Sequence, residues 1–211
     1  MRLLANAVAV RRPGRIGWSH AFWGERMGPA TLLIANRGEV AIRIARTAAD
    51  LGMRTVAIYS EDDAHSLHVQ RADAAIALRG KGPRAYLDAP QIIALAREAG
   101  CDSIHPGYGF LSESEAFAGA CREAGLVFVG PGVEVLALFG DKTRARLLAQ
   151  SLHVPVLRGT FGAASLDEMR RFLDSLGTDA QVVIKASAGG GGRGMRVVSH
   201  RDELADAFVR C

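Results

Sequence analysis

Four consecutive glycines, Gly189 to Gly192, separate two β-branched runs close to the last residue of this sequence. The first run, Val182-Val183-Ile184, ends on Lys185, and the second extends from Met195 to Val198. Because glycine has no Cβ, such a loop brings backbone N–H groups close to an anionic ligand. The loop joins two strands and does not open a helix, as a P-loop or dinucleotide fingerprint would. The pattern therefore predicts a strand–loop–strand flap over phosphate groups.

Three side chains beside the glycines extend this prediction. Lys185 would bring a compact ammonium to the phosphates, while Val183 and Met195 offer apolar surface to a flat ring such as adenine. A flexible glycine linker is the alternative interpretation, although linkers seldom lie between two β-rich runs. We therefore expect a nucleotide site here.

Composition narrows the class of protein. The 211 residues are 49% hydrophobic, and no uninterrupted apolar run reaches the length of about 18 residues that a membrane span needs. Cys101, Cys121 and Cys211 form no CxxC pair, which predicts a reduced, cytoplasmic protein without a metal site in this chain. The net charge of +4 comes mostly from arginines in the first thirty residues, so we expect neither a nucleic-acid nor a membrane partner.

Residues 1–30 read as an extension that precedes the folded protein. They are rich in arginine, glycine and proline and lack the apolar segment of a secretory signal. Our hypothesis is that translation begins at Met27; the alternative is an organellar transit peptide, which would imply import.

From Thr31 the pattern is α/β. Short apolar runs that predict strands alternate with helical periodicity, the strands at residues 32–35, 55–59, 74–78, 103–105 and 127–129, and the helices at 40–51, 90–99 and 113–124. This predicts a doubly wound, Rossmann-like parallel-sheet domain over residues 31–140. Its ligand face should lie where the strands end, at residues 36–39, 105–110 and 130–131.

A second, smaller unit is expected after this domain. Residues 141–153 predict a linker helix, and residues 154–211 predict a helix at 165–176, the glycine hairpin and a helix at 200–210. Ser165 and Glu168 have the spacing of a capping box, which predicts the start of the first of these helices.

Four segments together resemble the biotin carboxylase family, the ATP-grasp module of acetyl-, propionyl- and methylcrotonyl-CoA carboxylases and of pyruvate carboxylase. They are Ile34-Ala35-Asn36-Arg37-Gly38-Glu39-Val40-Ala41, His105-Pro106-Gly107-Tyr108-Gly109-Phe110-Leu111-Ser112-Glu113, Gly140-Asp141-Lys142, and the stretch from Ile184 to Val198. The resemblance implies a pre-ATP-grasp domain followed by an incomplete ATP-grasp lid subdomain.

The resemblance also implies an activity. The family uses MgATP and bicarbonate to form carboxyphosphate, and then carboxylates biotin on a carrier domain that serves a carboxyltransferase component. In this chain Lys142, Lys185 and the glycines Gly189, Gly190, Gly191 and Gly192 would contact the ATP phosphates, and Val183 and Met195 the adenine. Tyr108 and Gly109 would lie on the biotin side of the site.

Other residues have two interpretations. Arg43, Arg46 and Asp50 share one helical face, which would be a homodimer contact in the family or an exposed salt-bridged surface. His105 more simply closes a strand and bonds the backbone than takes part in catalysis, and Glu39 and Glu113 are explained by the helix dipole. Ala188 departs from the family, which usually has glycine there, and would stiffen or shift the lid.

The resemblance places the Mg²⁺ ligands, the bicarbonate-binding residues, the general base and the adenine-binding hinge after the glycine hairpin, beyond Cys211. We therefore expect no catalytic residue in this sequence, no activity of these residues alone, and an exposed edge and apolar face on the lid portion. Two alternatives stay open: another ATP-grasp ligase, such as a carbamoyl-phosphate or purine-pathway enzyme, and a non-catalytic fragment that keeps a dimerisation face.

Overall fold

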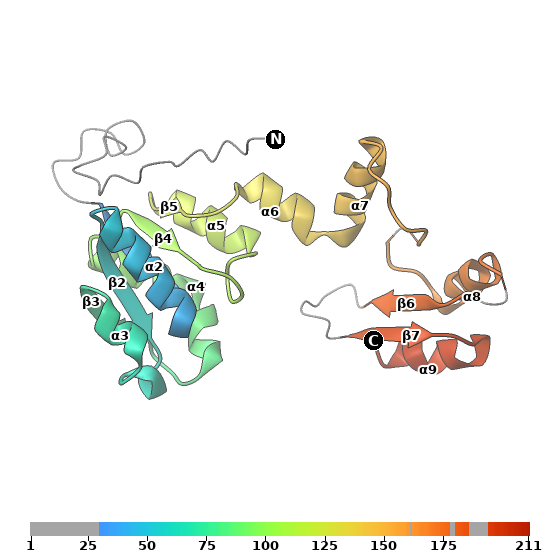
Figure 1. The fold of residues 1–211 in the computed structure, drawn as a ribbon, viewed down its shortest axis with the longest axis horizontal. Helices are drawn as coiled ribbons and strands as arrows, with labels where there is room; N and C mark the ends of the chain where they lie inside the picture. Colours follow the sequence, from blue (N-terminus) through green and yellow to red (C-terminus); the bar gives the residue numbers. More distant parts are fainter. Residues whose placement is uncertain (1–29, 161, 178–179, 186–193) are drawn as a thin grey trace, which may run out of the picture. The chain divides into compact units, whose positions relative to one another are not determined.

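The computed structural model describes residues 30–160, 162–177, 180–185 and 194–211, which form two compact units divided between Ala137 and Leu138 (Figure 1). The predicted phosphate-binding glycines Gly189 to Gly192, together with Ala188 and the N-terminal extension, lie outside the described residues. One helix, α6 (Val133–Gly140), crosses the boundary between the units.

A five-stranded parallel sheet forms the centre of the first unit, as predicted. In spatial order its strands are β3 (Ala74–Ala77), β2 (Arg54–Tyr59), β1 (Thr31–Ile34), β4 (Ser103–His105) and β5 (Val127–Phe128). The chain moves outward from β1 to β3 and then returns to pair β4 with the other side of β1. The carboxyl ends of β1 and β4 therefore meet at a topological switch point, where open α/β sheets bind their ligands.

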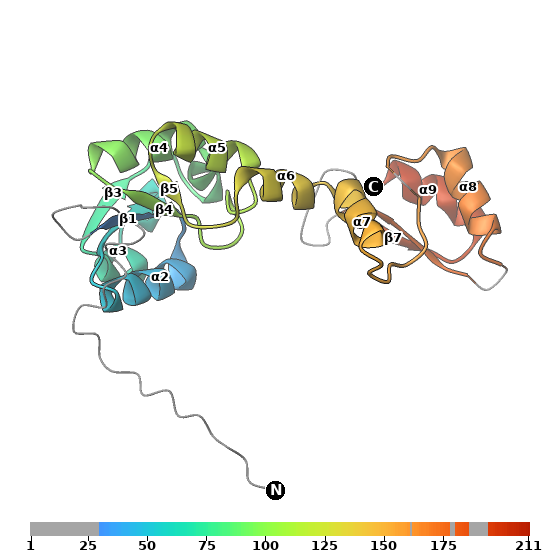
Figure 2. The same cartoon turned by 90° about the horizontal axis from the view of Figure 1, so that it is seen from above.

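Helices cover both faces of this sheet. Figure 2 shows α2 (Gly38–Asp50) and α3 (Leu67–Arg71) on one face, and α4 (Ala89–Glu98) and α5 (Glu115–Glu123) on the other. Leu32 and Ile34 pack with Ala41, Ala45 and Ala48 of α2, while Leu33 belongs to the larger cluster on the other face. Strand β1 is thus apolar and buried on both sides, which explains its continuous apolar sequence.

The second unit is built on an antiparallel hairpin. Its strands are β6 (Val182–Lys185) and β7 (Met195–Val198), and its helices are α7 (Lys142–Ser151), α8 (Leu166–Asp174) and α9 (Leu204–Val209), with a 3₁₀ turn η3 (Arg201–Glu203) before the last. Leu173, Ile184, Val198 and Leu204 make a small core that joins one face of the hairpin to α8 and α9. The predicted capping box of Ser165 and Glu168 is confirmed.

Several predictions of secondary structure need correction. Helix α3, helix α6 and the 3₁₀ turns η1 (Glu61–Asp63) and η2 (Pro83–Leu87) were not predicted, because they are short or, in α6, nearly continuously apolar. The helix expected at 200–210 begins as the turn η3. Glu113 precedes the N-cap Ser114, so its assignment to the first turn of a helix was wrong.

Within the described residues, none of the helices combines the length and the apolar character needed to cross a membrane.

Candidate functional site

The hairpin of the second unit presents an ammonium among apolar side chains. Lys185 pairs directly with Met195, and Val183 with Val197, so all four side chains lie on the face away from α8 and α9. Lys185 is exposed on this face, and Val183, Met195 and Val197 are 51%, 42% and 64% exposed. Val197 was not predicted as a member of this face. Its position two residues after Met195 on the same strand would have identified it, because alternate residues of a strand share a face.

Lys142, the other lysine expected to contact phosphate, is the first residue of α7. The carboxylate of the N-cap Asp141 accepts hydrogen bonds from the amides of Thr143 and Arg144, at 2.8 Å and 3.1 Å. Lys142 is exposed in the first turn, and Lys185 is exposed at the end of β6. Both predicted lysines thus belong to the second unit.

A buried asparagine joins the two loops at the switch point of the first unit. Asn36, just after β1, is 2% exposed, and its Nδ2 donates to the carbonyls of Pro106, at 2.7 Å, and Tyr108, at 3.0 Å. Its Oδ1 accepts from the amide of Arg37 at 2.8 Å. Because every polar hydrogen and the oxygen of this amide find partners, Asn36 holds the loop after β4 in one position.

Gly107 allows this close approach. Its φ is +67°, and a Cβ at this position would lie 2.6 Å from Nδ2 of Asn36 and 2.7 Å from Cγ1 of Val40. Only glycine fits the site without displacing the asparagine.

His105 starts the same loop and bonds its backbone, as predicted. The amide of Gly107 donates to Nδ1 of His105 at 3.0 Å, so Nδ1 carries no proton. Burial lowers the pKa of His105, which keeps the imidazole neutral and suited to this role.

The end of the loop is anchored by a polar cluster that sequence analysis missed. Phe110 stacks on Tyr86 with ring centroids 5.2 Å apart, and the Tyr86 hydroxyl donates to Asp63 Oδ2 at 2.8 Å. Burial is the main cause that raises the pKa of Tyr86 to about 12. Asp63 is 6% exposed and pairs with Arg37 through two contacts, at 2.9 Å and 3.0 Å. No sequence signal separates Asp63 from the adjacent acids Glu61 and Asp62.

Tyr108 projects from this fixed loop. Its side chain is 62% exposed, and its hydroxyl donates to Oε1 of Glu39, in the first turn of α2, at 2.5 Å. This hydrogen bond is the main cause that raises the pKa of Tyr108. Gly109 follows with φ +71°, and a Cβ added there would meet no other atom within 4 Å.

The predicted dimer face is exposed on α2. Arg43, Arg46 and Asp50 are all exposed, and no ion pair is found for them within the described part of the chain. The described residues therefore do not support the interpretation of this face as a salt-bridged surface.

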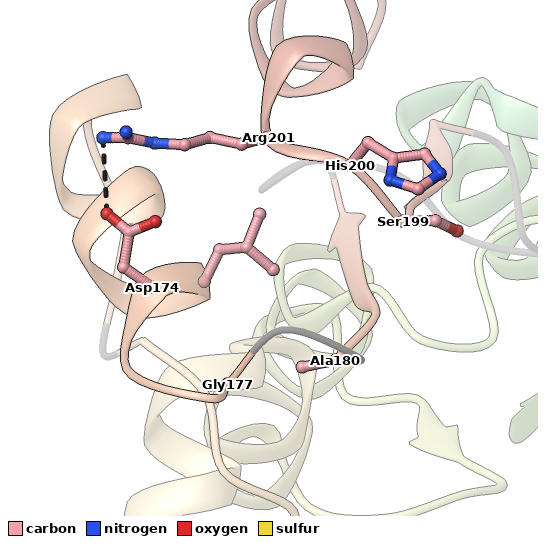
Figure 3. Close-up of a pocket in the computed structure, with 7 residues that line it drawn as sticks. Asp174, Gly177, Ala180, Ser199, His200 and Arg201 are labelled. Carbon is pink, nitrogen blue, oxygen red and sulfur yellow. Dashed lines mark ion pairs between the residues drawn. The ribbon is translucent and has the colours of Figure 1, made fainter.

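A pocket of about 290 Å³ lies at the opposite end of the hairpin from Lys185. Figure 3 shows its wall, where Asp174 and Arg201 form an ion pair at 3.3 Å. Its lining includes Ala180, Ser199 and His200 but none of the predicted binding residues. We therefore assign the candidate nucleotide surface to the exposed hairpin face and not to this pocket.

The described residues contain no group of three or more histidine, cysteine, aspartate or glutamate side chains arranged to hold a metal ion.

Comparisons with known proteins identify both units. Residues 29–136 match the model of the biotin carboxylase N-terminal domain, and residues 141–211 match the ATP-binding domain of the carbamoyl-phosphate synthase L chain. Pyruvate carboxylase of Staphylococcus aureus is 49% identical over 182 residues, which cover 85% of this chain and 16% of that protein.

Solved structures agree. The biotin carboxylase domain of a single-chain bacterial carboxylase is 50% identical with a TM-score of 0.77, covering 86% of this chain and 40% of that one. A dimer of the biotin carboxylase domain of Hydrogenobacter thermophilus 2-oxoglutarate carboxylase, in complex with MgADP, ADP and bicarbonate, is 40% identical with a TM-score of 0.80, covering 87% and 40%. The present chain thus spans a minor part of each relative's length. Because the first model covers just over half of its residues, the chain belongs to the biotin carboxylase family.

Proposed function

We propose that this chain supplies the N-terminal domain and part of the ATP-binding domain of a biotin-dependent carboxylase. In such an enzyme, ATP and bicarbonate drive carboxylation of biotin on a carrier domain, and a carboxyltransferase component then uses the carboxylated biotin. The matches to the biotin carboxylase N-terminal domain and to an ATP-binding domain, in that order along the chain, support this assignment.

The single observation that supports the proposal most strongly is the composition of the β6–β7 hairpin face that points away from α8 and α9. Lys185 lies opposite Met195 and beside Val183 and Val197, so one face combines an ammonium with apolar surface. An ammonium stabilises charge on phosphate oxygens, and the apolar side chains accept a flat purine ring. Lys142 and the glycines Gly189 to Gly192 are proposed to complete the contacts to the triphosphate.

A chimera tests the function. Residues 31–211 would replace the matching segment of the Staphylococcus aureus relative, and bicarbonate-dependent ATP cleavage would be measured with biotin present. We expect activity, and a large loss with Lys185→Ala. The carboxyltransferase half-reaction, which does not involve this segment, reports whether the chimera is folded. A chimera that retains the half-reaction but cleaves no ATP would refute the proposal.

Two other functions are distinguished by the same observations. The match of residues 141–211 alone would also fit a carbamoyl-phosphate synthase, but the match of residues 29–136 favours the biotin group. A non-catalytic role as a dimerisation module is supported only by the exposure of Arg43, Arg46 and Asp50. Sedimentation of the chain and of its Arg43→Glu variant tests self-association through this face, which we also propose for the complete carboxylase.

A further inference from the structure

Tyr108 and Glu39 form a contact between two exposed side chains that the fold brings together from distant parts of the sequence. The Tyr108 hydroxyl lies 2.5 Å from Oε1 of Glu39, although the residues are 69 positions apart. Arg43, one helical turn beyond Glu39, makes no ion pair with it in the described residues. Glu39 therefore engages the phenol and not the nearest arginine of its own helix.

The proton in this contact belongs to Tyr108. A phenol is a far weaker acid than a carboxylic acid, and the first turn of a helix favours a negatively charged side chain. An ionised carboxylate can only accept hydrogen bonds. The Tyr108 hydroxyl hydrogen therefore points toward Glu39, and the lone pairs of the phenol oxygen remain available on its other sides.

The backbone on both sides of the contact is fixed. Asn36 donates to the carbonyl of Tyr108 itself at 3.0 Å, and Gly107 packs against Asn36 without room for a side chain. Glu39 lies in the first turn of α2, three residues after Asn36. The hydrogen bond thus links two segments that the switch point already holds together, so the phenol keeps its orientation when a ligand approaches.

We infer that Glu39 is a positioning residue that makes Tyr108 a hydrogen-bond acceptor toward a ligand, so that this surface of the first unit selects a group with N–H donors. The inference rests on the proposed function, in which biotin is the group that is carboxylated; its ureido ring carries two such donors.

The first test measures the contact itself. Tyrosines labelled with ¹³C at Cζ are titrated by NMR in the 211-residue protein, and the Tyr108 signal is assigned by its loss in Tyr108→Phe. We expect Glu39→Ala to lower the pKa of Tyr108, since the bond that raises it is removed. Asp50→Ala, at the other end of the same helix, is the matched control and should leave this pKa unchanged. An unchanged pKa in Glu39→Ala would overturn the inference.

The second test measures donor selection with two small probes. 2-Imidazolidinone carries the two ureido N–H groups, and 1,3-dimethyl-2-imidazolidinone lacks them. We expect the first probe to shift the Tyr108 and Gly109 signals and to bind about threefold to tenfold more weakly to Glu39→Ala and Tyr108→Phe, as for loss of one hydrogen bond. The methylated probe should bind weakly to all three proteins.

Equal binding of the two probes, or no binding of either to the unmodified protein, would overturn the inference. Neither result bears on nucleotide binding at Lys185, so failure of this inference is distinguishable from failure of the proposed function.

Discussion

The guanidinium of Arg37 holds the carboxylate of Asp63 through two contacts, at 2.9 Å and 3.0 Å. Asp63 also accepts hydrogen bonds from Tyr86, Ser60 and Ser66, and Arg37 lies over the Tyr86 ring at 5.7 Å from its centroid. Arg37 directly follows Asn36, which clamps the loop of Tyr108. The ion pair therefore joins the segment after β1 to the turn after β2. It also helps to fix the position of Asn36, which holds the loop of Tyr108.

Asp63→Ala is expected to destabilise the first unit by about 2–3 kcal/mol, below the usual cost of breaking a buried pair because the Arg37 side chain is 35% exposed. Urea unfolding followed by the methyl NMR signal of Ile104, in the core of that unit, measures this change. Asp62→Ala removes the neighbouring exposed carboxylate and should cost clearly less than Asp63→Ala. Equal effects of the two variants would show that the Asp63 cluster has no special stabilising role.

Gly107→Ala and Gly109→Ala separate steric conflict from backbone preference. Both glycines have positive φ, +67° and +71°, but only a Cβ at residue 107 would meet Asn36 and Val40. We expect losses of unfolding free energy of about 2–5 kcal/mol for Gly107→Ala and about 1–2 kcal/mol for Gly109→Ala. The same urea experiment measures both. A Gly109→Ala variant as unstable as Gly107→Ala would contradict the packing of Asn36 against the loop.

The first unit should lose stability in mild acid through His105. Burial lowers the pKa of His105 below 6.5, so the unfolded chain binds a proton more readily than the folded protein. Both forms are neutral well above pH 6.5, and stability then falls as pH drops through 6.5 toward the folded pKa. His105→Asn keeps an acceptor for the Gly107 amide but does not titrate, so its unfolding free energy should change less between pH 7.5 and 5.5. An identical slope in the two proteins would exclude His105 as a cause.

The sequence predicted the location of the site better than its contacts. The parallel strands were correctly inferred to bring residues 36–39 and 105–110 to one edge, and Asn36 does reach Pro106 across 70 positions of sequence. The role of Asp63 was not predictable, because Glu61, Asp62 and Asp63 are consecutive acids and only the fold determines which one is buried. Helix α6 was missed because its nearly continuous apolar residues carry no helical period.

The most direct test of the central claim is an ATP titration of the 211-residue protein, followed by the NMR signals of Val183, Val197 and Met195. The account predicts that ATP shifts these signals and that Lys185→Ala weakens binding about tenfold, the cost of a charge-assisted hydrogen bond. Arg196→Ala is the matched control. Arg196 pairs with Ile184, one position along the hairpin from the Lys185–Met195 pair, so its removal should leave the ATP affinity nearly unchanged. An affinity that does not respond to Lys185→Ala, or that falls equally in Arg196→Ala, would contradict the assignment of this face to the nucleotide.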